Sequence, residues 1–277
     1  MTPATSTKFR PDEPHGIAGS IAAHAALPSR PIMTKPSQAA ARIDKLMENA
    51  SRALVETNYF DCESVCLEAL ELAHSVGDYE RMARILMPLQ EARRQIRLQA
   101  VDTGNLVILR EPIPEGQEID PGCYLIEPPL VGADARDLRD RASRRKTPVM
   151  VLAREPAVKS VKLDRRPGDW PVVMIGPVTL RAYVTPPDDG EVTHEWFQAA
   201  SEALGDRAIA EVDSGIDVFA RVEDLFERLH SVTDHEKLHQ ALEQACREAA
   251  AEPARPVAKG KNGPRGVEAE EALEDAA

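Results

Sequence analysis

The sequence predicts a mixed α+β protein in which helices flank a small α/β sheet and both ends of the chain are disordered tails. Apolar residues with helical spacing precede and follow a central stretch of short apolar runs. The two ends are rich in Pro, Ser, Gly or charge and have no sustained periodicity. We therefore expect a tail over 1–37, helices over 38–102, a small α/β domain over 103–190, C-terminal helices packed on the sheet over 191–252, and a tail over 253–277.

Charge and cysteine content narrow the class of protein. The 277 residues carry a formal net charge of -12, which disfavours non-specific binding to nucleic acid or to an anionic membrane. No run of 18 apolar residues occurs, so no transmembrane helix is expected. Cys62, Cys66, Cys123 and Cys246 form no CxxC motif and suggest no disulfide scaffold. We expect a cytoplasmic protein with reduced cysteines.

The first helical segment divides into three helices. Apolar residues follow a helical stripe over 43–54, again over 62–76, and a third time from about 79 to 100. Gly77-Asp78 ends the second stripe, because glycine is the usual residue just past a helix end. Pro88 lies inside the third stripe, where an interior proline predicts a kink or a break.

Small residues stand where neighbouring helices of this segment would touch. Ala50, Cys62 and Ala69 fill such positions, and Thr57 occupies the turn between the first two helices, where glycine is more usual. With the turn Thr57-Asn58-Tyr59, this pattern resembles a tetratricopeptide repeat over about residues 40–100. The resemblance implies a helical hairpin and a protein partner.

The rest of the chain alternates short strands with helices. Apolar runs predict four or five strands at 106–109, 123–126, 149–153, 172–175 and 178–184, with a charged helix over 133–145. Further helices are predicted over 195–204, 218–230 and 235–251, with a possible short turn at 208–212. Gly205-Asp206 is taken as a helix end. Trp196 and Phe197 are expected to pin a helix to the sheet.

One short motif has a specific chemical meaning. His235-Glu236-Lys237-Leu238-His239 matches HExxH, which resembles zinc metalloproteases, where the two histidines bind the metal and the glutamate activates water. A zinc-dependent hydrolase is therefore one hypothesis. The favoured interpretation is a surface or capped helix start, with a capping box in which Thr233 caps the helix and Glu236 reaches back to the backbone. On that interpretation the chain has no metal and no cofactor.

Two weaker ligand sites are also predicted. Eleven basic residues against four acids lie between Arg136 and Arg166, and this excess could bind an anion or a small ligand. Gly132 precedes a helix at the end of a strand, where α/β folds often bind ligands, although Asp134 would repel a phosphate. The segment 159–169 is expected to form a mobile loop.

The combined observations favour a non-enzymatic protein-binding or adaptor module. No GxSxG, GxxxxGK[ST] or GxGxxG motif is present, so the common nucleophile and phosphate-binding loops are missing. The expected partner is a protein bound through residues 38–100, with neither nucleic acid nor membrane as partner. The alternatives are the zinc-dependent hydrolase and a small-ligand or anion sensor.

Overall fold

The computed structural model describes residues 35–156, 166 and 168–252. Most of the two predicted tails, 1–34 and 253–277, and most of the predicted loop therefore lie outside the described residues. Residues 35–37 were predicted to belong to the first tail, but they begin the first helix instead. The described part contains seven helices and a five-stranded sheet, which confirms the predicted α+β class and strand number.

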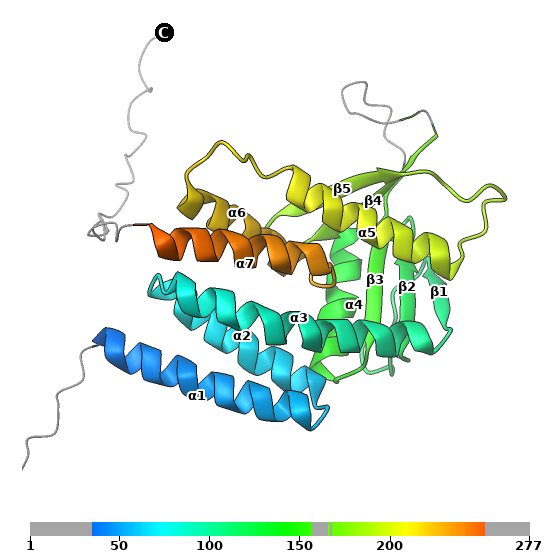
Figure 1. Cartoon of the computed structure of the whole chain (residues 1–277). Helices are drawn as coiled ribbons and strands as arrows, with labels where there is room; N and C mark the ends of the chain where they lie inside the picture. The colour runs from blue at the N-terminus through cyan, green and yellow to red at the C-terminus, as the bar shows by residue number, and fades with distance from the viewer. Residues whose placement is uncertain (1–34, 157–165, 167, 253–277) are drawn as a thin grey trace, which may run out of the picture. The chain divides into compact units, whose positions relative to one another are not determined.

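Three helices build the N-terminal part and run back and forth through two short turns (Figure 1). They are α1 (Lys35–Val55), α2 (Tyr59–Ser75) and α3 (Tyr79–Asp102). α2 packs against both of its neighbours. The small side chains of Ala50, Cys62 and Ala69 are fully buried here, which lets the helices approach closely.

The two turns between these helices have the same backbone geometry. Thr57 and Gly77 both have positive φ, at 59° and 69°. The next residue in each turn, Asn58 or Asp78, donates its N–H to the carbonyl five residues earlier, at 2.8 and 2.9 Å. Thr57 thus holds a left-handed conformation that glycine adopts without strain and a β-branched residue does not.

α3 continues through Pro88, so the break that the proline predicts is absent. Proline removes one backbone donor, which leaves the carbonyl of Arg84 without its helical partner. Arg84 is exposed, whereas Ile85 and Leu89 on either side of the proline are fully buried. Burial of α3 against α2 and the last helix, α7, maintains the helix across this position.

The sheet has the strand order β1-β2-β3-β4-β5. Its strands are β1 (Leu106–Leu109), β2 (Gly122–Ile126), β3 (Val149–Arg154), β4 (Trp170–Ile175) and β5 (Thr179–Val184). β1, β2 and β3 are parallel, and β4 and β5 are added antiparallel. β2 is buried along its whole length, because helices cover both faces of the sheet.

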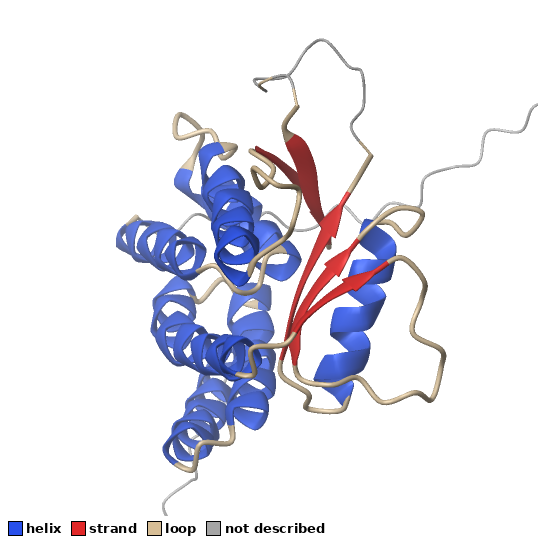
Figure 2. Cartoon of the chain, turned by 90° about the vertical axis from the view of Figure 1, so that its right-hand side faces the viewer, coloured by secondary structure: helices blue, strands red, loops and turns tan. Residues whose placement is uncertain are grey.

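The helices lie in layers on the two faces of the sheet (Figure 2). α4 (Gly132–Arg144) covers one face, and α3 and α5 (His194–Ala210) contact the other. The prediction that the helix ends at Gly205 is wrong: α5 runs through Gly205 and includes most of the predicted turn at 208–212. Trp196 does fix α5 to the sheet, since its indole Nε1 donates to the carbonyl of Thr185 at 2.8 Å and its ring meets Trp170 edge-on at 5.5 Å.

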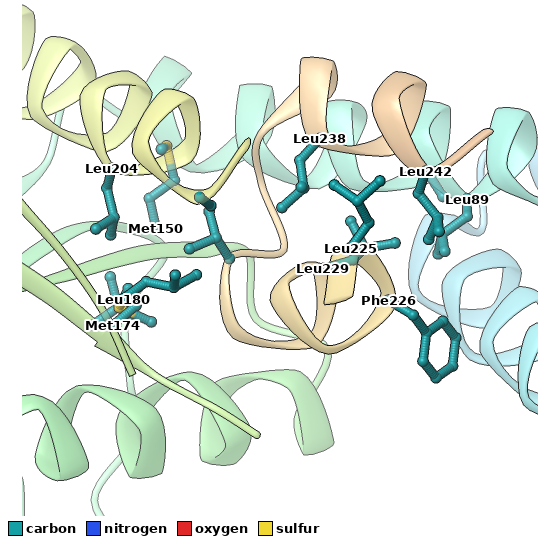
Figure 3. Close-up of a cluster of buried hydrophobic side chains, with 14 of the residues drawn as sticks. Leu89, Met150, Met174, Leu180, Leu204, Leu225, Phe226, Leu229, Leu238 and Leu242 are labelled. Carbon is teal, nitrogen blue, oxygen red and sulfur yellow. The ribbon is translucent and has the colours of Figure 1, made fainter. Parts of the chain in front are cut away.

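The last two helices close the structure over α3. α6 (Val218–Ser231) and α7 (Glu236–Ala251) pack on one another, and α7 packs on α3 and α5 rather than on the sheet. Figure 3 shows Leu242 of α7 beside Leu89, with Leu225, Leu229 and Leu238 next in the cluster, while Met150, Met174 and Leu204 lie over the sheet. No helix in the described residues is long and apolar enough to cross a membrane.

Candidate functional site

The HExxH segment begins α7, and its two histidines are buried. His235 is the residue that caps the helix: Leu238 N–H donates to His235 Nδ1 at 3.2 Å. The prediction that Thr233 is the cap is wrong, because its hydroxyl donates to Asp234 Oδ1 at 3.0 Å. The expected surface position is also wrong, since His235 and His239 are only 2% and 1% exposed.

Both ring nitrogens of His239 have partners inside the protein. Nδ1 donates to the carbonyl of His235 at 3.0 Å, and Arg93 Nη1 lies 3.3 Å from Nε2. Arg93 is itself buried and donates through Nε to Glu63 at 2.8 Å. Burial, followed by the charge of Arg93, lowers the pKa of His239 to about 3. His239 is therefore a neutral imidazole that accepts a hydrogen bond from Arg93.

The three residues of the motif point to different partners. His235 Nε2 lies 3.2 Å from Asp206 Oδ1 and 3.3 Å from Glu202 Oε2. Glu236 pairs with Arg97 at 2.5 Å. In the part of the chain that the structure describes, no three His, Cys, Asp or Glu side chains form a group that could hold a metal ion. The geometry therefore gives the zinc hypothesis no support.

The connection between α6 and α7, residues 231–235, is the centre of this region, and we name it the α6–α7 link. Ser231 lies against Gly176, where an added Cβ would come within 2.4 Å of the serine hydroxyl. His235 lies against Gly205, where an added Cβ would come within 2.1 Å of the imidazole. Two glycines, in the β4–β5 turn and in α5, thus allow the close approach that fixes the link.

Two pockets meet at the α6–α7 link. The first, which we name the junction pocket, has a volume of about 140 Å³ and lies between the sheet, α3, α5 and the link. The second, of about 220 Å³, lies between α2, α3, the end of α4 and the link. Arg139, Thr233 and Asp234 line both pockets.

Arg139 and Asp234 provide opposite charges at the place where the pockets meet. Arg139 Nη1 donates to the carbonyl of Ser231 at 2.9 Å. Burial raises the pKa of the Asp234 carboxyl, and the charge of Arg139 partly offsets this increase. Burial likewise lowers the pKa of Arg139, against the effect of Asp234. Each charge is therefore desolvated and only partly compensated.

Most of the described basic residues in the predicted anion-binding stretch bind within the chain. Arg141 and Arg145 donate to carbonyls of the loop between β1 and β2, and Lys146 pairs with Asp61 at 2.7 Å. Arg154 pairs with the buried Glu127 at 2.9 Å. Lys159, Lys162 and Arg165 lie outside the described residues. Arg139 is the member of this stretch that lines the two pockets.

The candidate site at the start of α4 is filled by packing. A Cβ on Gly132 would come within 2.9 Å of Ile175. Asp134 Oδ2 accepts the N–H of Val131 at 2.7 Å and so caps the helix. The glycine and the aspartate are thus both explained by the geometry of the turn.

A separate groove of about 680 Å³ lies between α1 and α3, and we name it the α1–α3 groove. Ile43, Met47, Leu54, Met87 and Pro88 contribute its apolar lining. Met87 is 66% exposed, which is unusual for so large an apolar side chain. The groove lies within the segment for which the sequence predicts protein binding.

No family model, curated protein or solved structure matches this chain. The resemblance to tetratricopeptide repeats over residues 40–100 therefore rests on the sequence pattern and on the helical hairpins alone. Function has to be inferred from the two pockets, the groove and the side chains that line them.

Sequence patterns did not predict that Arg139 and Asp234 line the same two pockets. These residues are 95 positions apart, and nothing in the local pattern connects a helix of the α/β part with the α6–α7 link. The sequence does place two polar residues, Asp234 and His235, next to each other at a helix start. Helix capping alone accounts for such a pair, so it did not indicate a buried site.

Proposed function

We propose that this chain is a non-enzymatic adaptor that binds a partner protein through its N-terminal helices, residues 38–100. The observation that carries the proposal is the α1–α3 groove, in which Met87 and the partly buried Met47 line a hollow open to solvent. Exposed methionines adapt to different apolar surfaces and are common where proteins bind helical segments.

The shape and charge of the groove favour an amphipathic helix as the bound segment. The groove follows two neighbouring helices, and its apolar lining would accept side chains spaced three or four residues apart. Glu48 on α1 and Arg84 on α3 are exposed, and no side-chain hydrogen bond or ion pair is made by either within the described residues, although the charge of Arg84 acts on Asp44. They are available to opposite charges on the edges of a partner helix, which would orient it.

The proposed compartment is the cytoplasm, and the proposal includes neither a nucleic-acid nor a membrane partner and no cofactor. All four cysteines are buried and unpaired, which supports a reducing compartment. The net charge of -12 supports the exclusion of polyanionic partners.

The test compares two full-length variants that carry the same charge change. Met87→Glu places a carboxylate in the groove, and Val55→Glu places one on α1 at a position that is 84% exposed and does not line the groove. Proteins captured from a cell extract are quantified for the wild type and both variants. We expect a partner whose capture falls about tenfold with Met87→Glu and is unchanged with Val55→Glu.

The captured partner is then purified, and its affinity for each variant is measured by calorimetry. We expect the wild type and Val55→Glu to bind the partner with equal affinity and Met87→Glu to bind it more weakly. The proposal is wrong if no captured protein distinguishes Met87→Glu from the wild type.

A further inference from the structure

The junction pocket combines an apolar floor with a polar end, which is the usual composition of a small-molecule site. Six of its apolar side chains come from four elements, α3, β3, β4 and α5, and are Leu98, Val101, Met150, Leu152, Met174 and Leu204. Its volume of about 140 Å³ is close to that of a cavity that holds one benzene-sized molecule. A ligand here is therefore compact, with one flat apolar body.

The polar end of the pocket is formed by Arg139 and Asp234. Arg139 makes one hydrogen bond, to the carbonyl of Ser231, and Asp234 accepts one, from the hydroxyl of Thr233. No ion pair joins the two side chains in the described structure. The printed ion pair of Arg139 is a long one, with Nε 4.0 Å from Asp140 Oδ1, so guanidinium N–H groups of Arg139 and a carboxylate oxygen of Asp234 stay available. Desolvated charges that are incompletely paired are costly.

The other charged groups of the pocket are already engaged. Arg97 pairs with Glu202 at 3.2 Å and with Glu236 at 2.5 Å, and it also donates to the carbonyl of Asp234. His235 accepts from Leu238 N–H through Nδ1. Its Nε2 makes no hydrogen bond but lies 3.2 Å from Asp206 Oδ1 and 3.3 Å from Glu202 Oε2, which already face it. These side chains form the wall of the pocket, and we assign recognition to Arg139 and Asp234.

The four charged side chains that line the pocket, Arg97, Arg139, Glu202 and Asp234, have formal charges that sum to zero. A charged ligand would lose its hydration without gaining a net opposite charge. A neutral group with one acceptor and one adjacent donor would satisfy both sides. Its acceptor would receive a hydrogen bond from an N–H of Arg139, and its N–H would donate a hydrogen bond to the Asp234 carboxylate.

We propose that the junction pocket binds a compact neutral molecule with a flat apolar body and a carboxamide or lactam edge. The apolar body lies on the sheet floor between Met150 and Met174. The amide edge bridges Arg139 and Asp234. This site shares no lining residue with the α1–α3 groove, so the ligand proposal does not depend on the proposed adaptor function.

The test uses three probes of equal size and different charge: benzamide, benzoate and benzamidine. Each is titrated into the full-length protein, and binding is followed by protein-observed NMR. We expect benzamide to bind most tightly and to shift the methyl signals of Met150 and Met174. The proposal is overturned if benzamide causes no shift at these methyls or if either charged probe binds more tightly.

Two variants test the assignment of the polar end. Asp234→Asn leaves Arg139 uncompensated and should change the benzoate-to-benzamide affinity ratio about tenfold in favour of benzoate, the size expected for one interaction with a charged group. Arg139→Gln should change the benzamidine-to-benzamide ratio by a similar factor in favour of benzamidine. A purely structural role for either residue would weaken all three probes alike and would contradict the proposal.

Matched controls carry the same chemical changes away from the pocket. Arg144→Gln lies on the same helix as Arg139, and Asp188→Asn lies in the loop before α5; both positions are exposed. Neither control variant should change the order of affinities of the three probes. If one pocket variant fails to fold, the other variant and the order of the probes in the wild type still decide the proposal.

Discussion

At the scale of single residues, His239 makes stability depend on pH. Its pKa is lowered to about 3 in the folded protein, mainly by burial, whereas an unfolded histidine titrates near 6.5. The unfolded chain therefore binds the proton first as the pH falls. The stabilisation is complete above about pH 6.5 and is lost progressively toward pH 3.

We expect this single histidine to account for about 2 kcal/mol of lost stability between pH 6.5 and pH 5. His239→Gln keeps a hydrogen-bonding side chain but does not titrate, so its free energy of unfolding should fall less over that interval. Urea unfolding at several pH values measures the difference. Equal pH dependence in the wild type and the variant would show that His239 is not buried as a neutral group.

Gly205 is the second residue with a large predicted effect. A Cβ at this position would lie 2.1 Å from the ring of His235, which is itself buried, so one of the two groups must shift. Gly205→Ala should reduce the free energy of unfolding by about 3 kcal/mol through overpacking. Gly215→Ala is the control, because the atom nearest to its added Cβ is a side-chain oxygen of Asp213 at 3.2 Å. A denaturation midpoint equal to that of the control would contradict this packing.

At the scale of secondary-structure elements, the two helix turns provide an internal comparison. Thr57 and Gly77 hold equivalent left-handed conformations, but only glycine does so without strain. Thr57→Gly should therefore stabilise the protein by about 1 kcal/mol, and Gly77→Thr should destabilise it by at least as much. Thermal melting of both variants shows whether each substitution raises or lowers the melting temperature. Destabilisation by Thr57→Gly would mean that this conformation costs little.

The packing of α2 gives the second prediction at this scale. Ala69 is fully buried in a helix that has neighbours on both sides, so Ala69→Leu should overpack it and cost about 1 to 3 kcal/mol. Ser64→Leu adds a leucine to an exposed position of the same helix and should change stability little. Unchanged melting of Ala69→Leu would contradict the close approach of these helices.

At the scale of the whole molecule, α3 joins the N-terminal helices to the sheet and to α7, and the described residues form one compact unit. The Ala69→Leu destabilisation should therefore be detected by the tryptophans, both of which lie in the sheet half at positions 170 and 196. Their fluorescence and the far-ultraviolet circular dichroism should change at the same midpoint. An earlier transition by circular dichroism would indicate that the helices unfold separately.

The elements could be predicted from the sequence because their causes are local. Apolar periodicity placed the helices and strands within a few residues, and Gly77 marked a helix end. Gly205 was mistaken for an end because its role is to admit His235, a contact across 30 residues. The candidate site could not be predicted for the same reason. The burial of His235 and His239, and the position of Arg139 and Asp234 in the same pockets, follow from tertiary packing, which no local pattern reveals.

The packing of α7 on α3 also has a consequence for how the chain is made. The two helices are separated by about 150 residues, so a ribosome working at about 5 to 20 residues per second completes α7 roughly 8 to 30 seconds after α3. During that interval the apolar face of α3, which includes Leu89, has no final cover. We therefore expect the nascent protein to expose this face until α7 is made, and we expect chains that stop before residue 236 to aggregate more readily than the full chain.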